Sequence, residues 1–322
     1  MKFLSRLLLG LAPLCIAATS AAQAYPTKPV HMIVSFAAGG GADLMARVVA
    51  LQLQKQLGQT FVVENRPGAS GSIGADVASK SAPDGYTILA GGNPELTFMP
   101  VVNDKLAYDP QRDLVPLVLA ANAPSVVVVH PDKGITTVAQ LLERARSSNG
   151  VAYGTPGRGT PMHLAFELMN VQYGTHFIHV PYKGGGPATA DVVAGQIDVA
   201  VINAPPLLPH IRAGKLLPLA VIQNERSPLL PDVPTFKEAS GLEGVLAPAW
   251  FGFSAPAKVP AEIRAVLERE IMRALGDPEV KARLVNAGME VVALPGARMA
   301  DVIRAETAYN ATTIKRLGFK PD

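Results

Sequence analysis

The sequence predicts an α/β protein built from two lobes, and three observations support that prediction. Short β-branched runs alternate with helical patterns along the chain, which favours α/β layers with largely parallel sheets. Three glycine-rich turns each join a strand-like run to a helical one. The 322 − 24 = 298 residues that follow Ala24 are enough for two lobes with a large core.

The first 24 residues are predicted to be a secretory signal peptide. Lys2 and Arg6 give a basic start, Leu7–Ala18 is almost wholly apolar, and Ala22-Gln23-Ala24 is a cleavage site of small residues. A membrane anchor is the alternative, but the apolar stretch is shorter than the ~20 residues that a span needs. We expect cleavage after Ala24 and a periplasmic protein.

Composition excludes several classes of function. Cys15 is the single cysteine and lies in the signal peptide, so the mature chain has no disulfide and no thiol site. Removing two of the 29 basic residues leaves 27 against 26 acidic ones, a net charge of about +1, which argues against nucleic acid as a partner. The histidines form no H-E-x-x-H motif and no G-x-S-x-G elbow occurs. We therefore expect no enzyme, no metal and no cofactor.

The patterning predicts the order of the elements. The expected strands are Val30–Val34, Thr60–Glu64, Tyr86–Ala90, Val115–Ala120, Ser125–Val129, Val151–Tyr153, Phe177–Pro181, Val199–Asn203, Leu217–Val221 and Trp250–Ser254. The expected helices are Asp43–Gln56, Gly71–Lys80, Val138–Ser147, Met162–Gln172, Pro187–Ala194, Pro260–Leu275, Pro278–Asn286 and Ala297–Leu317.

Proline and glycine residues that interrupt the apolar runs predict where the chain crosses between the lobes. Ala120–Pro124 separates two apolar strands, and Gly241–Ala249 precedes another. These crossings predict a first lobe of residues 25–124 plus 247–322 and a second lobe of residues 125–246.

The glycine-rich turns predict an anion site. They are Phe36–Asp43, Tyr153–His163 and Pro181–Pro187, and each leads from a strand into a helix. A helix start offers unpaired N–H groups and the positive end of its dipole, and glycine lets a ligand approach the backbone closely. The alternative is that they are ordinary tight turns. A nucleotide site is not supported, because neither G-x-G-x-x-G nor the P-loop pattern occurs.

Two cations stand in these turns. The guanidinium of Arg158 could pair with a carboxylate, and Lys183 could attract one, but a side chain that points to solvent is an equally weighted alternative for both. Ser70 in R-P-G-A-S-G-S-I-G could donate its hydroxyl to a ligand or simply cap a helix.

Ordered motifs along the whole mature chain carry a family resemblance. They are Y-P-T-K-P-V at Tyr25, F-A-A-G-G-G-A-D at Phe36, V-V-E-N-R-P-G-A-S-G at Val62, A-P-D-G-Y-T-I-L at Ala82, Y-D-P-Q-R-D-L at Tyr108, H-V-P-Y-K-G-G-G-P-A at His179, P-D-V-P-T-F-K-E-A at Pro231 and W-F-G-F-S-A-P at Trp250. With them the chain resembles the periplasmic substrate-binding proteins of tripartite tricarboxylate transporters, the Bug (Bordetella uptake gene) family.

The resemblance implies a Venus-flytrap, type II-like periplasmic binding protein, with two lobes joined by two crossing strands and a ligand cleft between them. It implies a monomeric receptor that holds a small organic acid and delivers it to the permease subunits of a membrane transporter. The ligand-binding residues carried over by the resemblance, with Arg158 added from its charge, are Phe36, Ala37, Ala38, Gly40, Gly41, Asp43, Ser70, Asn93, Thr155, Arg158, Gly159, Thr160, Lys183, Gly184 and Asn203.

Three departures from the family pattern narrow the class of ligand that this protein is expected to bind. Ser35 replaces a frequent proline, Arg158 a frequent small polar residue, and Ile202 a frequent acid. They favour a dicarboxylate or an aromatic carboxylate over a zwitterion, and Pro205-Pro206-Leu207-Leu208 is either an apolar wall of the pocket or core. A sensor subunit for a membrane kinase and a hydrolase on the same scaffold are the alternative functions.

Overall fold

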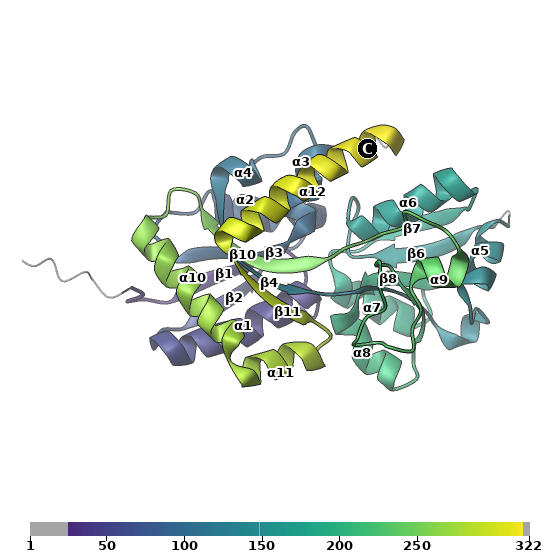
Figure 1. The fold of residues 1–322 in the computed structure, drawn as a ribbon, viewed down its shortest axis with the longest axis horizontal. Coiled ribbons are helices and arrows are strands. Elements are labelled where there is room, and N and C mark those ends of the chain that lie inside the picture. Colours follow the sequence, from purple (N-terminus) through teal and green to yellow (C-terminus); the bar gives the residue numbers. More distant parts are fainter. Residues whose placement is uncertain (1–24, 148, 318–322) are drawn as a thin grey trace, which may run out of the picture.

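The computed structural model describes residues 25–147 and 149–317, so the predicted signal peptide lies outside the described residues. The chain forms two sheets, one in each half of the molecule (Figure 1). The six-stranded sheet contains β1 (Val30–Val34), β2 (Phe61–Asn65), β3 (Thr87–Gly92), β4 (Leu114–Asn122), β10 (Trp250–Pro256) and β11 (Glu290–Pro295). The five-stranded sheet contains β5 (Ser125–Val129), β6 (Val151–Thr155), β7 (Phe177–Pro181), β8 (Val199–Asn203) and β9 (Leu217–Val221).

Both sheets are mixed, which corrects the expectation of largely parallel sheets. In the order β11-β4-β10-β3-β1-β2, strand β1 is parallel to β2 and β3, while β10 is antiparallel to β3 and β4. In the order β7-β6-β8-β5-β9, strand β6 is parallel to its neighbours, and β5 is antiparallel to β8 and β9. The antiparallel pairs arise because β4 leads out of the first sheet and β10 leads back into it beside β4.

Two segments connect the sheets, and hydrogen bonds hold them together. The chain passes from β4 to β5 through Ala123 and Pro124 and returns before β10. The N–H of Ala123 donates to the carbonyl of Ala249 at 3.0 Å, and the hydroxyl of Ser125 donates to the carbonyl of Ala247 at 2.6 Å. The two crossings therefore form one hinge; the exact residue boundaries of the lobes stay a prediction.

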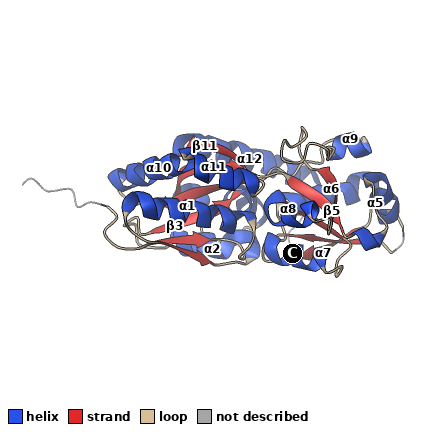
Figure 2. Cartoon of the chain, turned by 90° about the horizontal axis from the view of Figure 1, so that it is seen from below, coloured by secondary structure: helices blue, strands red, loops and turns tan. Residues whose placement is uncertain are grey.

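Helices cover both faces of each sheet (Figure 2). The helices are α1 (Gly41–Leu57), α2 (Ser72–Ser79), α3 (Met99–Val102), α4 (Pro110–Asp113), α5 (Val138–Ala145), α6 (Pro161–Tyr173), α7 (Gly185–Val193), α8 (Ala204–Arg212), α9 (Phe236–Ser240), α10 (Ala261–Gly276), α11 (Pro278–Asn286) and α12 (Gly296–Leu317). Three short segments are η1 (Ala69–Gly71), the π-helical η2 (Pro94–Phe98) and η3 (Pro131–Lys133). No helix of the described ranges is long and apolar enough to cross a membrane.

Strand β5 shows how the side-chain alternation of a strand builds the core. Val127 and Val129 pack into one cluster with α5 and α6, whereas Val126 and Val128 pack into another with α7 and α8. Because both faces of this strand are buried, its sequence is a continuous apolar run without alternation. The same arrangement holds in the first lobe, where α1, α10 and α11 cover one face and α2 and α12 the other.

Two of the longer elements, α8 and β11, were missed by sequence patterning. Helix α8 has the sequence A-P-P-L-L-P-H-I-R, whose prolines suppress a helix prediction, yet two of them lie in the first turn, where no N–H donor is needed. Strand β11 is an edge strand with no fully buried residue, so it lacks a clear apolar alternation. The short α3, α4 and α9 were also not expected.

Close packing within the first sheet predicts that Gly252→Ala destabilises the protein. A methyl group there would lie 2.6 Å from the carbonyl oxygen of Val118 and 2.9 Å from the Met299 side chain. We expect a loss of about 1–3 kcal/mol in the free energy of unfolding, measured by urea denaturation.

Gly276→Ala is the matched control, because the end of α10 leaves open space around that position. This variant should be neutral or more stable by up to about 1 kcal/mol, since alanine favours a helix. Equal effects of the two substitutions would contradict the packing argument.

Candidate ligand-binding cleft

Four helices begin at one point between the lobes. Helix α1 comes from the first lobe and α6, α7 and α8 from the second, and their N-cap residues are Gly40, Thr160, Gly184 and Asn203. The π-helical segment η2 starts beside them at Pro94. The starts of α1, α6 and α7 bring first-turn N–H groups without a partner inside the helix, and the positive end of a dipole. The start of α8 brings only its dipole, because Pro205 and Pro206 have no N–H and the Ala204 N–H donates to the carbonyl of Pro124 at 2.9 Å.

A cavity lies where these helices begin. Its lining residues are Phe36, Gly40, Gly41, Ala42, Asn93, Pro94, Pro156, Thr160, Pro161, Met162, Gly185, Asn203, Ala249 and Phe251. None of them is charged; two amides and one hydroxyl supply the polar side chains, and rings and methyl groups supply the walls. The cavity has a volume of about 30 Å³, which is room for a few atoms only. The described form is therefore a closed one. The helix dipoles around its cavity would stabilise an anion that backbone N–H groups hold.

The first glycine-rich turn is fixed from behind by Asp43. Its carboxylate accepts hydrogen bonds from the Gly39 N–H at 2.9 Å and from Asn65 Nδ2 at 2.9 Å, and it pairs with Arg47 at 2.9 Å. Asn65 Nδ2 also donates to the carbonyl of Phe36 at 3.0 Å. Burial opposes ionisation, but these hydrogen bonds outweigh it and lower the pKa of Asp43 below its ordinary value. Asp43 thus shapes the turn without lining the cavity.

The third glycine-rich turn meets the first turn across the cleft. The N–H of Ala37 donates to the carbonyl of Lys183 at 3.0 Å. A methyl group on Gly184 would come within 2.9 Å of the Ala37 nitrogen, and one on Gly186 within 2.4 Å of the Ala38 oxygen. Glycine is required here because the two backbones touch.

The second glycine-rich turn makes another contact between the lobes. The hydroxyl of Ser70 donates to the carbonyl of Arg158, and a methyl group on Gly157 would lie 2.7 Å from that hydroxyl. The turn is held by the Gly159 N–H, which donates to His163 Nδ1 at 3.0 Å, and by Thr160, whose side chain caps α6.

A buried pair of imidazoles supports this turn. The rings of His163 and His179 stack at 3.9 Å, and His179 Nε2 lies 2.7 Å from Thr155 Oγ1. Burial lowers the pKa of His163 to about 4 and that of His179 to about 3. Both rings are therefore neutral at pH 7, and His163 Nδ1 can accept the Gly159 hydrogen bond.

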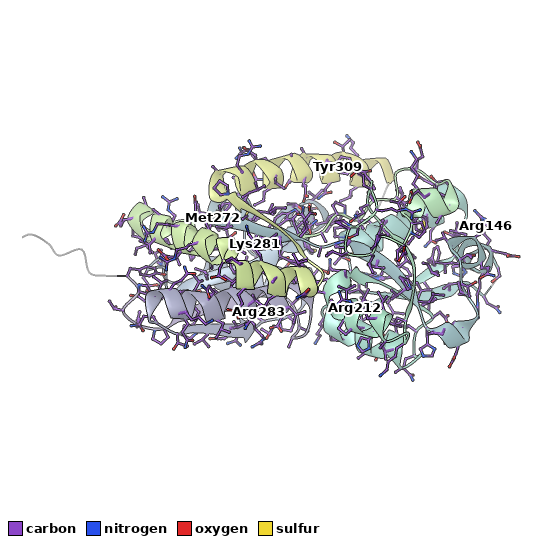
Figure 3. The ribbon with its side chains drawn as sticks, turned by 60° about the horizontal axis from the view of Figure 1, so that its bottom comes forward. Arg146, Arg212, Met272, Lys281, Arg283 and Tyr309 are labelled. Carbon is purple, nitrogen blue, oxygen red and sulfur yellow. The ribbon has the colours of Figure 1, made fainter. Side chains whose placement is uncertain are left out.

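Other contacts between the lobes lie outside the cavity. Leu164 of α6 packs in one apolar cluster with Met99, Val102 and Ile314 of the first lobe. On another face, shown in Figure 3, the Arg212 guanidinium donates to the carbonyl of Asn286 at 3.4 Å.

The structure brings part of the predicted set to the cavity. The predicted residues that line it are Phe36, Gly40, Gly41, Asn93, Thr160 and Asn203. The predicted residues that make or adjoin contacts between the lobes beside it are Ala37, Ala38, Ser70, Gly159, Lys183 and Gly184. Asp43 and Thr155 lie behind the turns. The side chains of Arg158 and Lys183 are exposed and do not line this cavity.

The cavity also contains residues that sequence reasoning missed. They are Ala42, Pro94, Pro156, Pro161, Met162, Gly185, Ala249 and Phe251. Gly185 stands in the third glycine-rich turn and Phe251 in W-F-G-F, so both had a signal in their motifs. Met162 stands at the end of the second glycine-rich turn, Tyr153–His163, whereas Pro94 and Ala249 had no such signal.

Known proteins share this architecture. Residues 45–319 match the model of the tripartite tricarboxylate transporter family receptor. The chain is 38% identical over 287 residues to protein BugT of Bordetella pertussis, covering 87% of this chain and 86% of BugT.

Two solved structures are also similar. One is an R. palustris protein with adipate, with a TM-score of 0.87, 33% identity, and coverage of 92% of this chain and 100% of the other. The other is MatC of Rhodopseudomonas palustris with bound malate, with a TM-score of 0.85, 29% identity, and coverage of 90% of this chain and 100% of the other. This chain therefore belongs to the tripartite tricarboxylate transporter receptors, the family of BugT, which are periplasmic solute-binding proteins and not enzymes.

Proposed function

We propose that this receptor captures a small organic carboxylate, either a dicarboxylate or an aromatic carboxylate, and delivers it to the permease subunits of a tripartite tricarboxylate-type transporter. The observation that carries the proposal is the convergence of four helix starts on a cavity with no charged side chain. Oriented N–H groups and dipole ends attract an anion without a cationic side chain.

The walls of the cavity favour a ligand with a carbon body. Phe36, Met162 and Phe251 supply apolar surface, and Asn93 and Asn203 supply amide groups. No carboxylate lines the cavity to pair with an ammonium group, which argues against a zwitterionic amino acid. The adipate and malate in the related structures have this chemistry, so they are the first probes for this chain.

Closure explains how binding would be signalled. In this closed form the turns of the two lobes contact one another, and opening the lobes would break these contacts together with those of a ligand that touches both lobes. A ligand with more contacts in the closed form shifts the population toward it. Because the closed cavity has space for few atoms, a larger acid would hold the lobes slightly farther apart.

The remaining expectations complete the proposal. The chain would be exported, cleaved after Ala24, and act as a monomer in the periplasm without a cofactor. Arg158 and Lys183, exposed at the turns that close the cleft, would attract an anion to its mouth rather than hold it inside.

A thermal-shift screen of residues 25–322 tests the proposal. The protein would be unfolded and refolded to remove co-purified ligand, then mixed with mono-, di- and tricarboxylates, aromatic acids and amino acids. A ligand that binds only the native state raises the melting temperature. We expect shifts with carboxylates. Shifts with zwitterions alone would refute the ligand class.

Asn203→Asp should weaken carboxylate binding at least about tenfold, a cost of about 1.4 kcal/mol. The change keeps the side-chain shape but replaces an amide in the cavity lining with a negative charge. Isothermal titration would measure the dissociation constant. Asn149→Asp, at an exposed position between α5 and β6, is the matched control and should bind as the wild type does. Unchanged affinity in Asn203→Asp would place the ligand elsewhere.

Asp43→Asn should lower the free energy of unfolding by about 1–3 kcal/mol near neutral pH and also weaken ligand binding, because the first turn loses its charged anchor. Since the pKa of Asp43 is below the ordinary 3.8, its stabilisation is present above that pH and lost as pH falls through the folded value.

The difference between the wild type and Asp43→Asn in urea unfolding should therefore shrink below about pH 4. Asp104→Asn, an exposed acid, is the control and should change stability by less than about 0.5 kcal/mol. A difference that persists at low pH would exclude the ionised anchor.

A further inference from the structure

A fully buried acid lies beneath the part of the cavity that the first lobe supplies. Glu95 is 0% exposed. Its Oε1 accepts hydrogen bonds from the Ser35 hydroxyl at 2.5 Å and from the Gly92 N–H at 2.8 Å. Its Oε2 is buried without a hydrogen-bond partner among the described residues. Neither the closure of the lobes nor the helix starts at the cavity require a carboxyl group at this position.

Glycines make the space for this carboxyl group. A methyl group on Gly91 would lie 2.0 Å from Oε1, and one on Gly71 would lie 2.7 Å from Oε2. Gly91 of β3 and Gly71 before α2 therefore leave space for the carboxyl group that any side chain would fill. The carboxyl group fits a site shaped for it.

Glu95 joins the two first-lobe segments that line the cavity. Ser35, its hydroxyl donor, directly precedes Phe36, and Asn93 and Pro94 directly precede Glu95 itself. The backbone here is the π-helical segment η2, a conformation that occurs often at functional sites. A change at the Glu95 carboxyl group would reach Phe36 through one hydrogen bond and Asn93 through two peptide units.

We propose that Glu95 is a positioning residue of the ligand site, which binds its carboxylate ligand while Glu95 is protonated and releases it more readily when Glu95 ionises. The proposal rests on the carboxylate-binding function proposed above.

Among the described residues, only hydrogen bonds from Ser35, Gly92 and the backbone of Glu95 itself stabilise the negative charge of Glu95. Tyr108 faces it from the segment before α4, and its hydroxyl donates to the Glu95 main-chain carbonyl at 2.7 Å. Asp76 of α2, which lies near Tyr108, is paired with Lys80, and Glu306 of α12 accepts a hydrogen bond from the Thr97 hydroxyl of η2 at 3.2 Å. Burial also raises the pKa of Glu306 above its ordinary value, but Glu306 is unchanged in a Glu95→Gln variant, which separates the two acids. No lysine, arginine or histidine is among the partners of Glu95 in the described ranges. Burial raises the pKa of Glu95 to about 7, against the opposing hydrogen bonds from Ser35 and Gly92.

Ionisation would place a negative charge behind the loops that hold an anion. For two unit charges about 10 Å apart at an effective dielectric constant of about 20, Coulomb's law gives a repulsion that weakens binding by roughly tenfold. Affinity should therefore fall as pH rises through about 7. The histidines of the second glycine-rich turn do not contribute in this range, because the pKa values of His163 and His179 are about 4 and 3.

Isothermal titration with adipate and with malate between about pH 6 and 8.5 tests the proposal, because carboxyl groups of this kind are largely ionised throughout. In the wild type, the dissociation constant should rise about tenfold across this range. Glu95→Gln keeps the acceptor oxygen for Ser35 and Gly92 but cannot ionise. Its dissociation constant should stay near the wild-type value at pH 6 over the whole range. The same pH dependence in both proteins would overturn the proposal.

Ser35→Ala supplies a second, independent test that does not alter the acid itself. It removes a donor that favours the ionised form of Glu95, so the pH at which affinity falls should move upward. An unchanged or lower midpoint would also overturn the proposal. Absence of binding at pH 6 in every protein, to adipate, malate and every carboxylate of the thermal-shift screen, would instead refute the carboxylate function, whereas binding without a pH effect would refute only the role of Glu95.

Discussion

The structure depends most on the contact of bare backbone between two glycine-rich turns. The Ala37 N–H reaches the Lys183 carbonyl at 3.0 Å only because Gly184 and Gly186 have no side chain to separate the lobes. Because of that approach, α1 and α7 begin within reach of one another, and the cavity beside them is small. A side chain at either glycine would hold the lobes apart, and the helix starts would no longer act on one ligand.

The same constraint explains where the charged residues are. The charged side chains lie behind the cavity and not in its lining. Asp43 pairs with Arg47 and fixes the first turn. Glu306 accepts a hydrogen bond from the Trp250 indole at 2.8 Å, which holds α12 against β10. Burial raises the pKa of Glu306 above its ordinary value, while hydrogen bonds lower the pKa of Asp43. Both acids thus support the scaffold. A ligand in the cavity would face helix dipoles rather than charged side chains.

Sequence patterning predicted the fold class and most elements, since burial on one or both faces leaves a clear period in strands such as Val30–Val34 and Ser125–Val129. It failed for α8, where first-turn prolines imitate a loop, and for the edge strand β11, which is only partly buried. At the site, glycine-rich motifs led to Gly40, Gly41 and Thr160 because their backbone geometry has a local sequence signal. Pro94 and Ala249 reach the cavity through tertiary packing, and no local sequence pattern predicts that. The direction of the Arg158 side chain is likewise decided by folding, not by its neighbours in the chain.

The cavity is also joined to the hinge, so that ligand contact and lobe movement share residues. Asn93 lines the cavity, and its Nδ2 donates to the carbonyl of Pro248 at 2.8 Å. Ala249, next along the returning crossing segment, lines the cavity as well and accepts from the Ala123 N–H of the outgoing one. A ligand that filled this space would therefore contact the first lobe, the second lobe and the segment that joins them. Because one bound molecule restrains all three, its binding energy bears directly on closure, without a relay through the core of either lobe.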